Sequence, residues 1–404
     1  MLFRSGISTK PPAGGKLRRE DGRWSAGVSP CPTRKGAVDC LPDPWIGLVE
    51  DGYLDLKNLA SRLEKTPDLC SRVQLDFLID EIIEWFAVAD QTLTSHIAAR
   101  CAKEIATYDI WFPLSHIYSS IDFPIGDVFF RTIPERMMEL YFEEWNKKPL
   151  NDAIRHKLSS RRSKLQGTLA ACVNITAERK AAQHIARLKV DHAVALLRFL
   201  SPVNQAVGMQ SYCLPLGREK IEISTELFVT ENKMRYNETV LERGPIGWDI
   251  DGDRTQFPDL LSLLHNLASN SGTEFRQLLY DALLLYSRNS VVADVADKLV
   301  FILVSLESML LKDSNEPIAK NIGERMAFLI GESVEERKKI VKNVDQTYRI
   351  RSEFIHHGDS PADLETVAEF FRNAWACFFT LLHSMNCGST KADLIDYLEE
   401  RKLS

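Results

Sequence analysis

Apolar residues recur at steps of three and four positions through most of this chain. Val295, Leu299, Ile302 and Leu306, for example, fall on one side of a helix. This spacing matches the 3.6-residue period of an amphipathic α-helix and differs from the two-residue alternation of a strand. With 404 residues, of which 45% are hydrophobic, the chain can bury more than one core. The sequence therefore predicts a mainly α protein of two or three domains.

Local composition divides the chain into segments of different character. Residues 1–42 are rich in Gly, Pro, Lys and Arg without periodicity, which predicts a disordered basic N-terminal arm. Residues 43–207 have helical spacing and predict a helical N-terminal region, with one helix carrying the apolar stripe over residues 75–86, another beginning at residues 137–142 and a third running from about residue 177 to residue 200. In residues 208–255 apolar residues alternate or cluster between turn residues, which predicts a small β-rich element. Residues 256–404 return to helical spacing and predict a C-terminal helical bundle.

Capping residues predict where several C-terminal helices begin and end. Ser290 can cap the helix that carries Leu299, and Gly331 can end the following helix, which carries Arg325. Ser333-x-x-Glu336 is a capping box that begins the next helix. Pro361 fits the first turn of the helix after that.

A polar run closes the helix that begins at the capping box. It reads Tyr348-Arg349-Ile350-Arg351-Ser352-Glu353-Phe354-Ile355-His356-His357-Gly358. An arginine guanidinium holds phosphate through a planar fork of donors. A histidine imidazole can give or take a proton near neutral pH. Together at one helix end, Arg351 and His356 indicate phosphodiester chemistry, which neither residue would indicate alone.

The Arg-x4-His spacing by itself has little specificity. It also occurs at Arg179/His184 and at Arg187/His192. The helical pattern continues beyond those two pairs, which predicts an ordinary solvated helix surface for both. At about 100° per residue, Arg351 and His356 lie roughly 140° apart around a straight helix. They can converge only if the last turn loosens, which Gly358 would allow, or if a second copy of the helix lies opposite.

The region from about residue 299 to residue 358 resembles the HEPN superfamily, and most closely the Apea-like HEPN domain. Four segments match in order, namely residues 304–311, 324–331, 335–339 and 348–358. The resemblance implies a four- or five-helix bundle that usually dimerises, with both Arg/His pairs facing one cleft. It also implies a metal-independent endoribonuclease without a cofactor, often a toxin or an antiviral effector.

The resemblance implies roles for particular side chains. Arg351 would hold the phosphoryl oxygens while a histidine takes the proton of the ribose 2′-hydroxyl, whose oxygen then attacks phosphorus. His356 keeps the five-residue offset, but His357 follows directly, so either imidazole could be the base. The product would carry a 2′,3′-cyclic phosphate. Tyr348 and Ser352 belong to the same run and are expected to support the site.

Glu307 stands in an apolar stretch of the helix that carries Leu299 and Leu306. A carboxylate that close to a core needs a partner. One hypothesis is that Glu307 orients Arg351 from the neighbouring helix. The alternative is that Glu307 lies on the solvent edge of its helix.

A basic stretch in the N-terminal half predicts a weak RNA-binding ridge, and its alternative is a solvated helix face. Its cations are Arg155, Lys157, Arg161, Arg162 and Lys164. No aromatic residue alternates with these charges, so base stacking is not predicted there. The net charge of −6 gives no global attraction for nucleic acid, so RNA binding needs a local patch.

Other features exclude whole classes of site. The eight cysteines include no C-x-x-C pair, which argues against a zinc site or a disulfide framework and for the cytoplasm. Asp249, Asp251 and Asp253 match a calcium loop only in part, which favours an acidic turn. No histidine or carboxylate cluster predicts a metal site. No apolar run approaches the ~18 residues of a membrane span.

Two other functions remain compatible with the same residues. In a non-catalytic HEPN module, Arg351 and His356 would bind a nucleotide or RNA phosphate without cleaving it. In a helical adaptor, residues 44–255 would carry the function and the C-terminal bundle would only dimerise. The expected partners are an RNA substrate, a second copy of the chain and an unidentified regulator. His383 is expected to be a hydrogen-bonded packing residue.

Overall fold

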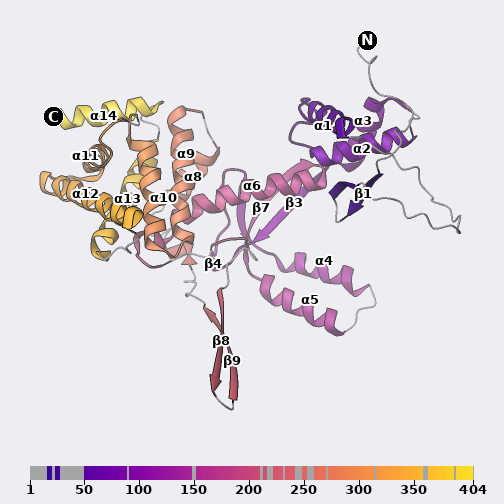
Figure 1. Ribbon diagram of the computed structural model, residues 1–404, viewed down its shortest axis with the longest axis horizontal. Helices are drawn as coiled ribbons and strands as arrows, with labels where there is room; N and C mark the ends of the chain where they lie inside the picture. The colour runs from indigo at the N-terminus through magenta and orange to yellow at the C-terminus, as the bar shows by residue number, and fades with distance from the viewer. Residues whose placement is uncertain are drawn as a thin grey trace, which may run out of the picture. The chain divides into compact units, whose positions relative to one another are not determined.

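The computed structural model is mainly helical, as the apolar spacing predicted (Figure 1). It describes residues 16–20, 23–27, 50–88, 91–147, 152–209, 213–215, 222–230, 233–241, 248–252, 259–269, 272–313, 315–357, 363–385 and 388–403. The chain divides into two compact units. The first consists of Met1–Ile110 and Asn174–Ala186, and the second of Trp111–Val173 and Arg187–Ser404. Within the described ranges, no helix is both long enough and apolar enough to cross a bilayer.

An antiparallel hairpin lies within the segment predicted to be a disordered arm. Strands β1 (Lys16–Glu20) and β2 (Arg23–Gly27) pair so that Lys16 lies opposite Gly27. The prediction over residues 1–42 is therefore wrong for these two strands. The sequence signal is Asp21-Gly22 between them, since Asp-Gly is typical of a two-residue hairpin loop.

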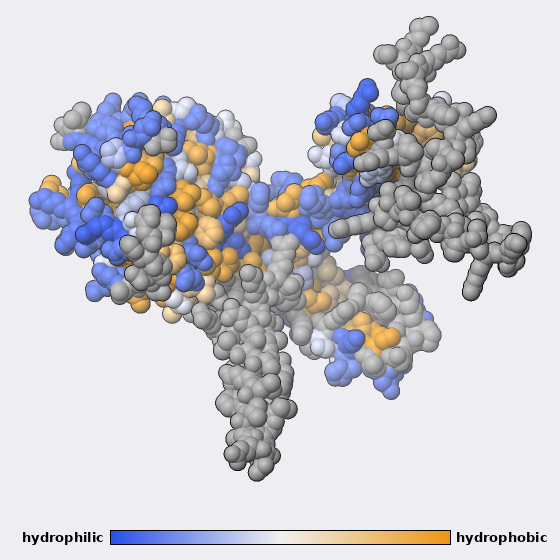
Figure 2. Space-filling model, in the orientation of Figure 1, coloured by the Kyte–Doolittle hydropathy of each residue, from blue (hydrophilic) through white to orange (hydrophobic). Residues whose placement is uncertain are grey.

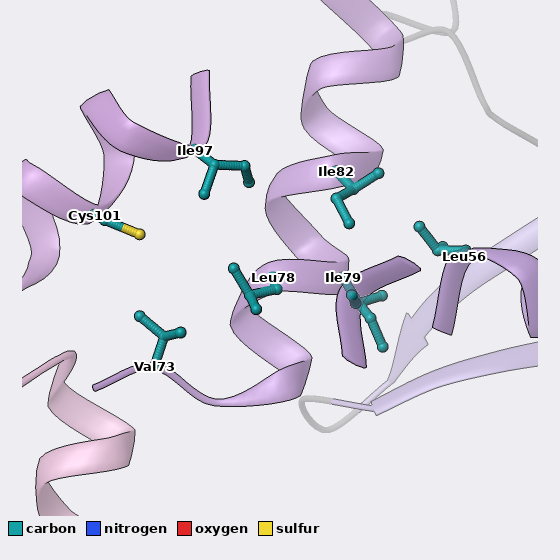
Figure 3. Packing of buried hydrophobic residues seen from close by; sticks show 8 residues of the cluster. Leu56, Val73, Leu78, Ile79, Ile82, Ile97 and Cys101 are labelled. Atoms are coloured by element: carbon teal, nitrogen blue, oxygen red, sulfur yellow. The ribbon is translucent and has the colours of Figure 1, made fainter. Parts of the chain in front are cut away.

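Three helices of the first unit surround one apolar cluster. They are α1 (Glu50–Glu64), α2 (Leu75–Val88) and α3 (Leu93–Glu104). Leu56, Leu78, Ile82 and Ile97 point toward one another in this cluster (Figure 3). The helix predicted from the apolar stripe over residues 75–86 is confirmed, because that stripe supplies the buried side of α2.

A four-stranded sheet lies in the region predicted to be helical. Its strand order is β3 (Ala106–Pro113), β7 (Leu169–Ala177), β6 (Val128–Thr132) and β5 (Phe123–Ile125). The prediction of a helical region over residues 43–207 is therefore wrong for residues 106–132 and 169–177. The run from Leu169 to Val173 is buried at every position, so it lacks the alternation that would have indicated a strand.

Helices connect the strands of this sheet. Between β6 and β7 lie α4 (Glu135–Asn146), which was predicted, and α5 (Asp152–Leu165). Helix α6 (Arg179–Arg198) follows β7, and the helix predicted there is confirmed. Helix α8 (Leu260–Ser269) packs against β5. Gly126, directly after β5, allows this close contact, because a Cβ at that position would lie 3.0 Å from the Cβ of Ala268. Its φ of 58° also favours glycine.

Residues 208–255 contain strands, as predicted. Strands β8 (Glu222–Thr230) and β9 (Lys233–Leu241) form an antiparallel hairpin. A short parallel pair joins β4 (Ile117–Tyr118) to β10 (Trp248–Asp249). Outside this segment, the 3₁₀ turn Pro202–Gln205 follows α6, and the 3₁₀ turn Ser287–Val291 precedes residue 295, where the next helix begins.

The C-terminal helices form a bundle within the second unit. They are α9 (Glu274–Tyr286), α10 (Val295–Leu310), α11 (Ile318–Ile330), α12 (Val334–His357), α13 (Leu364–His383) and α14 (Lys391–Leu403). Helix α11 packs against α10, α12, α13 and α14. Hydrophilic residues cover much of the visible face of these helices, with apolar patches between them (Figure 2).

The predicted domain boundaries at residues 207 and 255 do not separate compact units. The ring of Phe199 stacks on Trp375 with centroids 5.7 Å apart and meets Tyr286 edge-on. The Lys298 ammonium donates to the carbonyl oxygen of Met209. These buried contacts join the segment after α6 to α9, α10 and α13, so the bundle does not begin as a separate domain at residue 256.

Two of the four predicted helix ends are found as expected, and two differ. The capping box is confirmed, because Glu336 N donates to Ser333 Oγ and Ser333 N donates to Glu336 Oε2, both at 3.2 Å. Gly331 caps α11, as predicted. Helix α10, however, is capped by Asp294, and Ser290 lies in the preceding 3₁₀ turn.

The start of α13 also differs from the expected one. Its capping residue is Asp363, whose carboxylate accepts from the backbone N–H of Thr366. Pro361 lies outside the described residues.

A buried arginine links three elements of the bundle. Arg325 is 3% exposed, and its Nη1 donates to Leu310 O at 2.6 Å. Both oxygens of Glu316 accept from Arg325, at 2.7 and 2.9 Å, and Glu399 Oε1 accepts from its Nε at 3.1 Å. The hydrogen bonds from Arg325 lower the pKa of Glu316 to about 2. A charged carboxylate is therefore part of the folded state.

This pKa predicts acid sensitivity with a defined sign. Because folding depresses the pKa of Glu316 from 4.5 to about 2, the stabilisation is present above pH 4.5 and is lost as the pH falls toward 2. We expect the loss to be about 1–2 kcal/mol, since Glu316 keeps some contact with solvent that screens the pair. Urea unfolding between pH 5 and pH 2 measures it.

Two substitutions make this measurement specific. Glu316→Gln should flatten the fall in stability over that range. Glu335→Gln, which removes an exposed partner of Lys338, should leave the fall unchanged. Identical pH dependence in all three proteins would contradict the assignment to Glu316.

Candidate functional site

The predicted partner of Arg351 is close to it in the structure. Tyr348 and Arg351 lie on one side of α12, three residues apart, and face Glu307 on α10. The Tyr348 hydroxyl donates to Glu307 Oε1 at 2.9 Å, and Arg351 Nη1 lies 4.0 Å from the same oxygen. Glu307 thus accepts a hydrogen bond from Tyr348 and lies beside the guanidinium of Arg351. This arrangement agrees with the hypothesis in which Glu307 orients Arg351.

Arg351 is held without using all its donors. Its side chain is 28% exposed, and that of Glu307 is 21% exposed. Arg351 Nε is buried and has no hydrogen-bond partner among the described residues. Buried donors are normally satisfied. An anion beside Arg351 would supply the acceptor that the described residues do not.

The Tyr348 hydroxyl remains a donor at neutral pH. Burial raises its pKa above the usual value, and the adjacent Glu307 carboxylate raises it further. The proton therefore stays on Tyr348, and the hydroxyl donates a hydrogen bond to Glu307 Oε1. The Arg351 guanidinium faces the same oxygen.

The two histidines occupy the last two positions of α12, and their side chains lie outside the described ones. The helix continues through His357, so its last turn does not loosen before the histidines. Positions 351 and 356 are then roughly 140° apart around the axis. A loosened last turn, the first of the two routes to convergence, is therefore not seen in the described backbone. Ser352 is exposed, and Gly358 lies outside the described residues.

The other Arg-x4-His pairs lie in different surroundings. Arg179 and His184 are both exposed on α6. Arg187 is exposed as well, and His192 Nδ1 lies 3.1 Å from the Tyr280 hydroxyl, with the two rings edge to face. Arg179 and Arg187 are exposed, whereas Arg351 is half-buried. The burial of the arginine therefore distinguishes the Arg351 pair from the other two, which the spacing does not.

The predicted basic ridge lies on α5. Arg155 and Lys157 are exposed, and Arg162 is half-buried over the ring of Phe142. Arg161 and Lys164 are on the same helix, with side chains outside the described ones.

One group of potential metal ligands contradicts the expectation that no such cluster exists. Glu81, Glu84 and His96 in the first unit place one ligand atom each within 4.8 Å of one another. Sequence reasoning missed them because α2 and α3 bring together residues 15 positions apart. Arg100 Nε, however, already donates to Glu81 Oε2 at 2.7 Å, and His96 Nε2 lies 3.1 Å from the same oxygen. The buried carboxylate is thus balanced by a guanidinium.

The acidic turn behaves as a structural element. Asp251 accepts from the Ser119 hydroxyl at 3.3 Å and from the backbone N–H of Ser120 at 2.8 Å. Asp249 accepts from the backbone N–H of Asp251. Together with Tyr118 these residues line a cavity of about 280 Å³. Asp253 lies outside the described residues.

His383 is hydrogen-bonded, as expected. Its Nδ1 lies 2.9 Å from Phe379 O, and its ring packs on that of Phe379 with centroids 4.3 Å apart.

Comparison of the chain with protein-family models, curated proteins and solved structures found no significant match. The resemblance of residues 299–358 to the HEPN superfamily therefore stays a prediction that rests on the residues quoted for it.

The geometry around Glu307 predicts a measurable role for Tyr348. Tyr348→Phe removes one donor from a half-buried carboxylate and should lower the free energy of unfolding by ~1–3 kcal/mol. Urea denaturation measures the change. The control is Arg349→Gln, which removes only an exposed 3.8 Å pair with Asp345 and should cost less than ~0.5 kcal/mol. Equal unfolding midpoints for the two variants would remove the case for a Tyr348–Glu307 bond.

Proposed function

We propose that this protein is a metal-independent endoribonuclease that uses Arg351 and a histidine at the end of α12 to cleave RNA. The observation that carries the proposal is the state of Arg351. Its guanidinium is oriented by Glu307, it is half-buried, and its Nε has no acceptor among the described residues. A guanidinium in this state can bind an anion, and it precedes His356 by five residues on the same helix.

The proposed reaction needs two functions from the protein. A histidine, His356 or His357, takes the proton of the ribose 2′-hydroxyl, whose oxygen forms a bond to the adjacent phosphorus. The bond from phosphorus to the 5′-oxygen breaks, and that oxygen takes a proton as it leaves. Arg351 stabilises the charge that develops on the phosphoryl oxygens. The products are a 2′,3′-cyclic phosphate and a 5′-hydroxyl.

A second copy of the chain completes this proposed site. Because α12 stays helical through His357, Arg351 and His356 of one chain diverge around the helix axis. A twofold interface would place the histidines of one copy opposite the arginine of the other. The family resemblance, which implies dimers and a toxin or antiviral role, supports the same arrangement.

A non-catalytic anion site is the second candidate, because the unpaired Nε of Arg351 also suits phosphate binding without cleavage. Such a module would bind RNA or a nucleotide and leave it intact.

The first test is cleavage of end-labelled single-stranded RNA in EDTA. Arg351→Ala should reduce the cleavage rate by ~10²–10⁴, and so should one of His356→Ala and His357→Ala, the one that loses activity being the base. His184→Ala, from the exposed pair on α6, is the matched control and should retain full activity. RNA that is bound but never cut by the unaltered protein would favour the non-catalytic module. Inhibition by EDTA would contradict the mechanism.

The second test asks whether the site is shared between copies. Arg351→Ala and His356→Ala chains are co-expressed with different affinity tags, and the mixed dimer is isolated. If each site takes its arginine from one copy and its histidine from the other, one site remains intact and about half the activity returns. If both residues come from one chain, every site is damaged and the mixed dimer is as inactive as its parents. Should His357 prove to be the base, His357→Ala replaces His356→Ala.

A further inference from the structure

A line of aromatic rings and guanidinium groups crosses the second unit, outside the proposed catalytic site. On β6, Phe129 is 45% exposed, and the Arg131 guanidinium lies 5.2 Å from the centre of its ring. The same guanidinium lies 5.8 Å from the ring of Trp111 on β3. Arg131 thus lies between two aromatic rings, the closer of which is open to solvent.

The sheet places small side chains beside Phe129 and Arg131. Phe129 pairs with Cys172 on β7 and with Pro124 on β5, and Arg131 pairs with Ala170. Directly paired residues lie on the same face of a sheet, so the neighbours of Phe129 and Arg131 are small. The opposite face is filled instead, as the stacked rings of Phe123 and Phe130 show.

The same line continues onto the two inserted helices. Trp111 and Phe142 both pack against the small cluster formed by Ile133, Met138 and Ala170. The Arg162 guanidinium lies 5.6 Å from the ring centre of Phe142. Rings and guanidinium groups therefore occur together from α5 and α4 across β3 to β6. We call the set Phe129, Arg131, Trp111, Phe142 and Arg162 the stacking surface.

Charge divides between the two inserted helices. Helix α5 contains five Lys or Arg residues and one acid, Asp152, whereas α4 contains four Glu residues and one Arg. Arg155 and Lys157 of α5 are exposed. The carboxylate of exposed Asp122 lies 4.0 Å from Arg131 Nε. Arg131 Nε has no hydrogen-bond partner among the described residues. Helix α5 itself therefore carries a net positive charge in a chain whose net charge is −6, and its Arg162 lies 3.9 Å from Glu135 of α4.

We propose that the stacking surface and α5 bind single-stranded RNA. Bases stack on the exposed ring of Phe129 beside Arg131, and the phosphates follow the cations of α5. Aromatic rings with arginine recognise unpaired bases, which a duplex keeps stacked inside. The choice of RNA rests on the proposed ribonuclease function, and the surface would then deliver an unpaired strand as substrate.

The test measures binding separately from cleavage. A fluorescein-labelled single-stranded RNA of mixed sequence is titrated with Arg351→Ala protein, in which cleavage is blocked, and the anisotropy is recorded. Phe129→Ala should weaken binding by about 5- to 150-fold, the range expected for loss of one stacked base. Phe129→Tyr keeps the ring and should retain the affinity. Arg131→Gln should weaken binding and make it less dependent on salt.

Matched controls separate this surface from others. Tyr397→Ala removes an exposed ring that also lies beside an arginine, 5.8 Å from the Arg401 guanidinium on α14, and should have no effect. Single-stranded DNA of the same sequence should bind similarly, and duplex RNA should bind more weakly. Thermal melting of each variant checks folding, and the exposed position of Phe129 predicts little change.

Each outcome bears on one of the two proposals. Unchanged RNA affinity in folded Phe129→Ala and Arg131→Gln proteins overturns this inference, even if the unaltered protein cleaves RNA. Loss of RNA binding in those variants supports it, even if no protein cleaves RNA and the ribonuclease proposal fails. If Phe129→Ala instead weakens self-association without changing RNA affinity, the surface is a contact between copies and the inference is wrong.

Discussion

Arg325 is the interaction on which the geometry of the proposed site depends. Moving a guanidinium out of water costs several kcal/mol unless its donors find good acceptors, and here Leu310 O, Glu316 and Glu399 accept from it. These acceptors lie at the end of α10, in the segment after it and on α14, while Arg325 itself is on α11. The Arg325 guanidinium can reach all these acceptors only when α10, α11 and α14 are packed as they are here. Since Leu310 is less than one turn from Glu307, the same bond fixes the end of α10 that presents Glu307 to α12.

The contrast between Arg325 and Arg351 explains why only one of them suits an exchangeable ligand. Arg325 has a bidentate partner, two further acceptors and almost no contact with solvent. Arg351 has a single carboxylate at 4.0 Å, partial exposure and an unpaired Nε. Because Tyr348 donates to Glu307, the carboxylate is held in place without the help of Arg351. Glu307 can then orient the guanidinium and still leave donors for a phosphate.

Sequence reasoning found the elements whose signals are local. The apolar stripe of α2, the capping box at Ser333 and Glu336, and the end of α11 at Gly331 each depend on residues within a few positions of one another. It missed the four-stranded sheet, because β6 pairs with a strand some forty residues away and β7 is buried without alternation from Leu169 to Val173. The pairing of Glu307 with Arg351 was one of two hypotheses, and it rested on the need of a carboxylate near a core for a partner. Glu81, His96 and Arg100 were missed because nothing local indicates that they meet.

The stacking surface shows the same limit in a functional feature. The basic stretch of α5 contains no aromatic residues, so its sequence predicted phosphate contacts without stacking. The rings come from other elements, namely β3, β6 and α4. For a chain with a net charge of −6, long-range attraction contributes little to nucleic-acid binding. Affinity must then come from short-range contacts, and stacking is one that the overall charge does not weaken. An acidic protein that binds RNA should therefore combine aromatic rings with a local patch of cations, and the surface around Phe129 and Arg131 has that composition.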